Sequence, residues 1–265
     1  PCLSTALAVI FLLTTAHTLP AAPLRQAVTS LNAAVRPSDA IITNDPEATM
    51  PFAELYQGQA PVLGLNNGGF PLPAAVTGRL AETLAQHRQI WWLPNWLPPE
   101  QSAIEQTLLA EGFKAREENF DGQRLLLFAL PGALPTRPVE ATFDGRLHLL
   151  SVAKPPQVSA GSALPVELTW QALAPIGQDY HVFVHLVSEA GEVVAQADGQ
   201  PANWQRPTST WAVEELITDR HGLWLSPDTI PGRYELRLGL YDPASGARLL
   251  LPAGEDAVRV EVGVE

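Results

Sequence analysis

YELRLGLY, residues 234–241, alternates its side chains with a period of two: Glu235 and Arg237 point one way, and the apolar residues point the other. Successive side chains of a β-strand project to opposite faces of the sheet. A strand of this kind has one face in a hydrophobic core and one face in water. HVFVHL at residues 181–186 follows the same pattern. These two stretches therefore predict an antiparallel β-structure in the second half of the chain.

Further strand candidates extend this pattern along residues 140–265, at a spacing near ten residues and separated by Gly- and Pro-containing turns. Short, evenly spaced strands of this kind predict an immunoglobulin-like antiparallel β-sandwich. The candidates are Arg146–Val152, Leu164–Gln171, His181–Ser188, Val193–Asp198, Leu216–Leu225, Gly232–Tyr241, Arg248–Pro252 and Ala257–Val264.

Residues 25–130 alternate helix-like and strand-like segments. The expected strands cover residues 39–43, 60–65 and 89–93, and amphipathic helices lie between them. Alternation of this kind favours parallel strands with right-handed crossovers. The Asp121-Gly122 pair between two apolar runs predicts a terminal hairpin. We therefore expect a small Rossmann-like, three-layer α/β domain, joined to the sandwich by a Pro-rich linker at residues 131–139.

The first 24 residues contain no Asp, Glu, Lys or Arg, and AVIFLL at residues 8–13 is entirely apolar. About 20 such residues in a helix span a bilayer. Because the chain begins with Pro1 and nothing basic precedes the apolar run, we expect the last transmembrane helix of a longer chain. A signal peptide and a buried globular helix are the alternatives. The expected fold is thus multidomain: membrane helix, α/β domain and β-sandwich.

Composition limits the classes of function. The formal net charge is −12, and no basic cluster occurs, which argues against nucleic acid as a partner, since phosphates are bound by Lys and Arg. The scarcity of basic residues after the apolar run indicates an extracytoplasmic tail. Cys2 is the only cysteine, so an internal disulfide and a cysteine zinc site are excluded.

Four stretches carry a resemblance to a known family: RPSDAIIT (36–43), HVFVHL (181–186), AQADGQP (195–201) and PGRYELRLGLYD (231–242). With the layout of apolar helix, α/β domain and sandwich, the chain resembles the C-terminal end of bacterial membrane glycosyltransferases similar to the dolichyl-phosphate-mannose protein mannosyltransferases (family 39, GT-C class). The resemblance implies sugar transfer from a polyprenyl-phosphate donor at the outer face of the membrane. It also implies a catalytic carboxylate in a loop far upstream, so no catalytic residue is assigned here.

The first candidate binding site lies at the ends of the expected parallel strands. Asn44 and Asp45 follow the first strand, and Asn66 and Asn67 follow the second. Ligands of open parallel sheets bind beyond the carboxyl ends of strands, so these side chains could hold a sugar or a cation. Ordinary turn and capping chemistry is the alternative.

Two further candidates lie in the sandwich. Trp204 and Trp211 stand in a segment rich in Pro, Asn and Gln, where exposed rings could stack on sugars; burial in the core is the alternative. A polar set could in principle bind a metal, but a hydrogen bond between His185 and Asp198 across adjacent strands is the interpretation we favour. We therefore assign no metal and no cofactor. The polar set is His181, His185, Asp198, Asp219 and His221.

The sequence thus predicts an accessory, non-catalytic, extracytoplasmic part of a polytopic glycosyltransferase in a bacterial cell membrane. The expected partners are membrane lipid and, through the parent enzyme, a polyprenyl-phosphate sugar and an acceptor glycan or protein. The parent chain is expected to be a glycosyltransferase, and this part of it is expected not to be catalytic by itself. The alternative is a membrane-anchored carbohydrate-binding or structural surface module.

Overall fold

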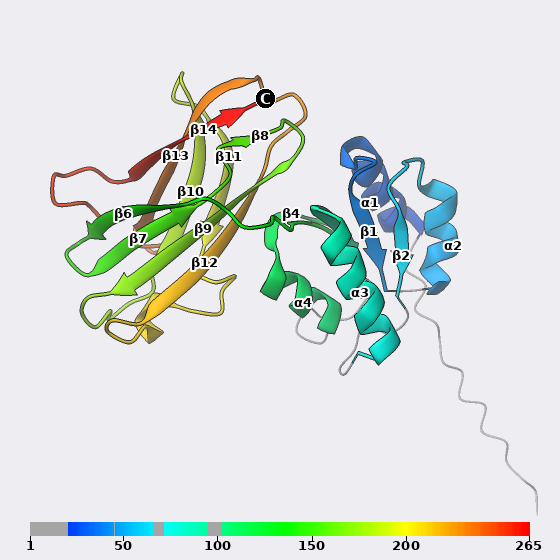
Figure 1. Ribbon diagram of the computed structural model, residues 1–265, viewed down its shortest axis with the longest axis horizontal. Helices are drawn as coiled ribbons and strands as arrows, with labels where there is room; N and C mark the ends of the chain where they lie inside the picture. Colours follow the sequence, from blue (N-terminus) through cyan, green and yellow to red (C-terminus); the bar gives the residue numbers. More distant parts are fainter. Residues whose placement is uncertain (1–20, 45, 66–71, 95–101) are drawn as a thin grey trace, which may run out of the picture.

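The computed structural model describes residues 21–44, 46–65, 72–94 and 102–265. Two units lie side by side: an N-terminal sheet with helices and a C-terminal pair of packed sheets (Figure 1). Strands account for 43% of the residues and helices for 19%, so the molecule is predominantly β-structure.

The N-terminal sheet has five strands in the order β2-β1-β3-β5-β4. Its first three members run parallel to one another, whereas β5 is antiparallel to both β3 and β4, so the sheet is mixed. The β4–β5 turn has positive φ at Asp121 (53°) and Gly122 (95°), which confirms the predicted hairpin. The strands are β1 (Ala40–Thr43), β2 (Val62–Gly64), β3 (Gln89–Leu93), β4 (Phe113–Phe120) and β5 (Gln123–Ala129).

Helices cover both faces of this sheet. Alternate residues of β3 define the two faces: Trp91 lies in the core with α1 and α2, and Trp92 lies in the core with α3 and α4. Burial of these apolar stripes stabilises the unit at roughly 25 cal/mol per Å² of apolar surface. The helices are α1 (Ala21–Ala34), α2 (Pro46–Leu55), α3 (Ala74–Gln86) and α4 (Ala103–Glu111).

The expected fold class is wrong in two respects. The N-terminal unit is not a Rossmann-like, helix-rich domain, because its parallel strands are only three to five residues long and the antiparallel β4–β5 hairpin supplies the longer strands of the sheet. The transmembrane helix is also corrected: among the described residues, no helix is long and apolar enough to cross a bilayer. Residues 1–20 of the predicted span lie outside the described part of the chain.

The end of that predicted span shows where the error arose. Residues 21–24 belong to α1, which begins at Ala21, and the Leu24 side chain is only 4% exposed in the core against the sheet. Its apolar character therefore serves packing within the protein. With the span corrected, the predicted location in a bacterial cell membrane is corrected too.

The C-terminal unit is a sandwich of two sheets, with orders β11-β10-β13-β14-β8 and β12-β9-β7-β6. All but one of the predicted strands occur; in the stretch 248–252, Arg248 alone forms an isolated bridge, to Tyr241. The first sheet contains β8 (Gln157–Val158), β10 (His181–Ser188), β11 (Val193–Gly199), β13 (Gly232–Tyr241) and β14 (Val258–Val264). The second contains β6 (Thr136–Phe143), β7 (Leu147–Ala153), β9 (Ala163–Ala172) and β12 (Leu216–Trp224).

The sandwich core follows the predicted alternation. Val182, Val184 and Leu186 of β10 are fully buried. The opposite face is mixed, because Phe183 and Val187 are also buried, whereas His181 and His185 are partly exposed. Strand β6 begins inside the stretch predicted as a linker and contains Pro138. An edge strand tolerates proline because one side of its backbone needs no ladder hydrogen bond.

The two units are in direct contact. Trp91 of β3 meets Trp224 of β12 edge to face, with ring centroids 5.9 Å apart. The Ala163 amide of β9 donates a 2.7 Å hydrogen bond to the Gln89 side-chain oxygen. Gly222 of β12 passes so near β4 that a Cβ atom there would lie 2.8 Å from Ala115. This contact brings β4 alongside the sandwich and creates the cleft described next.

Candidate functional site

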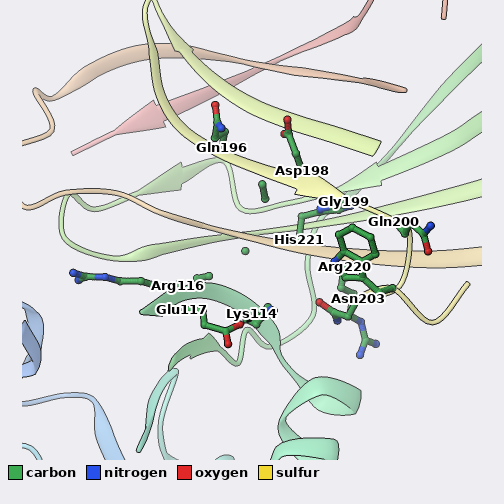
Figure 2. Close-up of a pocket in the computed structure, with 14 residues that line it drawn as sticks. Lys114, Arg116, Glu117, Gln196, Asp198, Gly199, Gln200, Asn203, Arg220 and His221 are labelled. Atoms are coloured by element: carbon green, nitrogen blue, oxygen red, sulfur yellow. Dashed lines mark hydrogen bonds and ion pairs between the residues drawn. The ribbon is translucent and has the colours of Figure 1, made fainter. Parts of the chain in front are cut away.

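A cleft of about 270 Å³ lies between β4 of the first unit and β11 and β12 of the sandwich. In Figure 2, Gln196 and Asp198 line it from β11 with their polar ends directed away from β4, and Lys114, Arg116 and Glu117 line it from β4. Both units therefore contribute walls to the cleft. The remaining lining residues are Ala115 of β4, Ala197 and Gly199 of β11, Gln200, Asn203 and Trp204 of the turn after β11, and Arg220, His221 and Gly222 of β12.

The turn after β11 has an unusual backbone. Ala202, Asn203 and Trp204 have φ values of 53°, 52° and 69°, so three consecutive non-glycine residues are left-handed. Each such residue costs about 1–2 kcal/mol, although Asn tolerates the conformation better than most. Strain of this kind gathers at ligand sites because the surrounding structure must over-determine it. The surrounding contacts must therefore hold this turn in place.

Asp219 of β12 stabilises the turn through a hydrogen bond to its backbone. Its carboxylate is fully buried and accepts 2.8 Å from the Ala202 amide through Oδ1. The other oxygen, Oδ2, lies 2.7 Å from His221 Nε2. Hydrogen bonds to a charged acceptor contribute about 1.5–3 kcal/mol, which offsets part of the backbone strain. Asp219 is thus a positioning residue for the turn.

The turn carries Trp204, whose indole ring is exposed to solvent on one side and packs against His181 and β11 on the other. Trp204 is 58% exposed, and its centroid lies 5.0 Å from that of His181 in an edge arrangement. A Cβ atom on Gly199 would lie 3.2 Å from the indole nitrogen, so glycine lets the ring rest against β11. An exposed indole fixed in one place offers a ready surface for a ligand.

The charges at the cleft are paired within the protein. Lys114 contacts Glu117 at 3.0 Å, and Arg220 contacts Glu167 of β9 at 2.9 Å. Arg116 contacts Glu118 at 2.9 Å. No cation of the three is left to balance an anionic ligand, so the cleft is suited to an uncharged, polar one.

Glu117 remains ionised at neutral pH. Burial raises the pKa of its carboxyl group, but the charge of Lys114 and hydrogen bonds from Lys114 and Arg124 outweigh burial and lower the pKa below its ordinary value. A general acid needs a pKa near the working pH. Glu117 is therefore unsuited to donate a proton and is suited to accept hydrogen bonds.

The polar set predicted in the sandwich divides into pairs. His185 Nε2 lies 2.9 Å from Asp198 Oδ1, which confirms the predicted bond between adjacent strands. His181 Nδ1 lies 3.3 Å from the Tyr241 hydroxyl. Within the described ranges, no group of three or more His, Cys, Asp or Glu side chains has the geometry to hold a metal ion. The nearby donors and acceptors of the cleft are mainly amides and paired charges.

The other predicted site residues are placed as follows. Trp211 is 4% exposed, lies in the sandwich core and donates 3.0 Å to the Arg206 carbonyl. Asn44 is buried at the end of β1. Asp45, Asn66 and Asn67 lie outside the described residues. Of the expected binding residues that the structure describes, Trp204 lines the cleft, and Asn44 and Trp211 do not.

Sequence reasoning missed the residues of β4 and β12 that form the opposite walls, notably Lys114, Glu117 and Arg220. One signal was available: Gly222 interrupts an otherwise ordinary strand. A glycine inside a strand often marks a place where another backbone approaches closely, and here that backbone is β4. The signal predicts a contact but does not identify the contacting segment.

Comparisons with known proteins give little further direction. No family model and no curated protein matches this chain. The CARDB domain of the PF1109 protein from Pyrococcus furiosus, in complex with di-metal ions, is 16% identical over 43% of this chain and 87% of its own, with a TM-score of 0.29. These values support no functional argument.

Two other solved structures are similarly distant. A β-glucosidase from Listeria innocua in complex with glucose is 18% identical, with a TM-score of 0.30, over 47% of this chain and 16% of its own length. The C-terminal domain of wzt is 13% identical, with a TM-score of 0.34, over 51% of this chain and 81% of its own. Similarity at this level leaves the cleft itself as the basis for a function.

Proposed function

We propose that this chain is a non-catalytic carbohydrate-binding module whose ligand lies in the cleft between β4 and the sandwich. The observation that carries the proposal is Trp204, a half-exposed indole held over the cleft by three consecutive left-handed residues. Such a backbone persists only where surrounding contacts impose it. The exposed ring supplies an apolar face on which the C–H face of a sugar ring stacks.

The polar lining supplies the second half of sugar recognition. Gln196, Gln200 and Asn203 present amide groups, each with both donors and acceptors. Asp198 already pairs with His185, and Glu117 already accepts from Lys114 and Arg124, but each carboxylate has further lone pairs that can accept from hydroxyl groups. Ligand sites typically combine an apolar surface with a few polar groups that fix orientation. This combination matches an uncharged polyol better than a phosphate, because the cations of the cleft are already paired.

The proposal is limited to glycan binding. Nothing in the described residues favours the expected role as an accessory part of a glycosyltransferase or its polyprenyl-phosphate-sugar donor. Nucleic acid is disfavoured by the net charge of −12, since counterion release on phosphate requires free Lys and Arg.

A glycan array followed by calorimetry on the best ligand tests this function. Trp204→Ala removes the stacking surface, and we expect affinity to fall by at least about tenfold, as for a Trp at the centre of an interface. Trp204→Phe keeps an aromatic face and should retain most of the binding. Because Trp204 is exposed, both variants should keep the thermal unfolding midpoint of the parent within a few degrees.

The matched control is Leu216→Ala. Leu216 is a large apolar residue of the sandwich that is 63% exposed and does not line the cleft, so its removal should leave affinity unchanged. The proposed function is rejected if no glycan binds, or if Trp204→Ala binds as well as the parent.

A further inference from the structure

A second cleft, of about 350 Å³, adjoins the first on the other side of the strained turn. The two clefts share Asn203 and Arg220 as lining residues. Ala202 and Gln205 line only the second, and Trp204 lines only the first. Successive residues of one short turn thus face both clefts, which makes them neighbours along the same surface.

The chemistry of the second cleft resembles that of the first. Gln205, Thr218 and Asn203 provide amide and hydroxyl groups, and Leu109 of α4 provides apolar surface. Arg220 is the charged residue among those that line it, and this side chain is held by Glu167 at 2.9 Å and by the Ala110 carbonyl. Its charge is therefore already balanced. The second cleft, like the first, is suited to an uncharged ligand rich in hydroxyl groups.

The sizes of the clefts indicate how much ligand they hold. Small-molecule sites usually measure about 300–1,000 Å³. The first cleft, at about 270 Å³, is just below that range and the second, at about 350 Å³, is near its lower end. Together they fall well inside it. A ligand that filled both would contact the Trp204 ring, the turn and α4 at once.

We propose that the two clefts are adjoining subsites of one groove that binds a neutral oligosaccharide of at least two sugar units. This inference rests on the proposed carbohydrate-binding function and adds the length of its ligand. One sugar unit stacks on Trp204 in the first subsite, and a neighbouring unit hydrogen-bonds to Gln205 and Thr218 in the second. Asn203 and Arg220 lie where the ligand passes from one subsite to the other.

The experiment compares ligand lengths. Calorimetry is run with the mono-, di- and tetrasaccharide forms of the sugar selected on the array, using the full chain. We expect the tetrasaccharide to bind at least about tenfold more tightly than the monosaccharide. Gln205→Ala should weaken the tetrasaccharide by about three- to tenfold and leave the monosaccharide unchanged, whereas Trp204→Ala should weaken both.

Gln178→Ala is the matched control, because Gln178 is an exposed amide of the sandwich that lines neither cleft. The extended groove is rejected if affinity is independent of ligand length, or if Gln205→Ala changes nothing while Trp204→Ala abolishes binding. In that result the proposed function stands and only the second subsite is lost. Absence of binding by the parent protein overturns both.

Discussion

The boundary between the two units is closed in one part and open in another. In the closed part, Trp91 packs on Trp224, and Gln89 accepts from the Ala163 amide. In the open part, Lys114 and Glu117 of β4 line one side of the cleft, and β11 with Asp198 lines the other. Apolar rings and small residues allow close contact, whereas solvated, paired charges keep the walls apart. The boundary thus joins the units and leaves a binding cleft between them.

The largest expected effect comes from Gly222, where the closed part meets the open part. Gly222→Val would place a Cβ atom 2.8 Å from the Ala115 backbone and from the Lys114 carbonyl carbon. Overpacking of this kind costs about 3 kcal/mol, and β4 would be forced away from β12. We expect a lower thermal unfolding midpoint and weaker glycan binding together.

Gly177→Val is the control for this variant, since a Cβ at Gly177 meets nothing within 4 Å. It should change stability by less than about 0.5 kcal/mol. Equal stability of the two valine variants would show that the contact between β12 and β4 is not as close as described.

Gln89 tests the closed part by itself. Its side-chain oxygen accepts from the Ala163 amide, and its side-chain nitrogen donates 3.0 Å to the buried Asp39 carboxylate. Gln89→Ala leaves the Ala163 amide unpaired and removes one hydrogen bond from Asp39, whose Oδ2 still accepts from Trp91 Nε1 and the Arg36 amide. We expect a cost of about 2 kcal/mol. Chemical denaturation should show this loss, whereas Gln86→Ala on the exposed surface of α3 should not. Glycan affinity should be largely unchanged, because Gln89 does not line the cleft. A loss of binding as large as that of Trp204→Ala would show that the closed part of the boundary contributes directly to binding.

Glu117 tests the open part and should give the smallest effect. Its folded-state pKa is lowered, so its contribution to stability is present at neutral pH and is lost as the pH falls below the ordinary glutamate value of about 4.3. Glu117→Gln should therefore destabilise the protein at pH 7 by less than about 1 kcal/mol, as for a partly exposed ion pair.

The measurement is the free energy of unfolding of parent and variant at pH 7 and near pH 3. The difference between them should shrink at the lower pH, where the parent carboxyl is also protonated. A difference that grows on acidification would mean that the ion pairs with Lys114 and Arg124 do not lower the pKa.

Local patterns predicted the strands and one turn correctly. Alternation in residues 234–241 reports burial on one face, as a strand in a sandwich experiences. Residues 181–186 form the predicted strand as well, although Phe183 on the face opposite the core is also buried. The Asp121-Gly122 pair predicted its hairpin because the turn needs positive φ at both residues. The same reasoning failed for residues 248–252, where apolar residues do not form a strand, and for the N-terminal apolar run, whose last residues pack in a protein core.

The candidate site was much less predictable. Trp204 and Trp211 have similar sequence surroundings, yet the first is 58% exposed and the second is 4% exposed. Their difference depends on the turn at residues 202–204, which contains no glycine to signal positive φ. The turn is held instead by Asp219, a residue that follows it by more than a dozen positions.

By itself, the sequence determined the periodicity of the sandwich strands, the β4–β5 turn and the excess of acidic residues, because these depend on side-chain order and composition alone. Only the tertiary structure decided which tryptophan faces solvent and that β4 would lie against β12. Both outcomes depend on contacts between segments far apart in the chain, such as Ala202 with Asp219 and Gly222 with Ala115. The cleft exists because those segments meet.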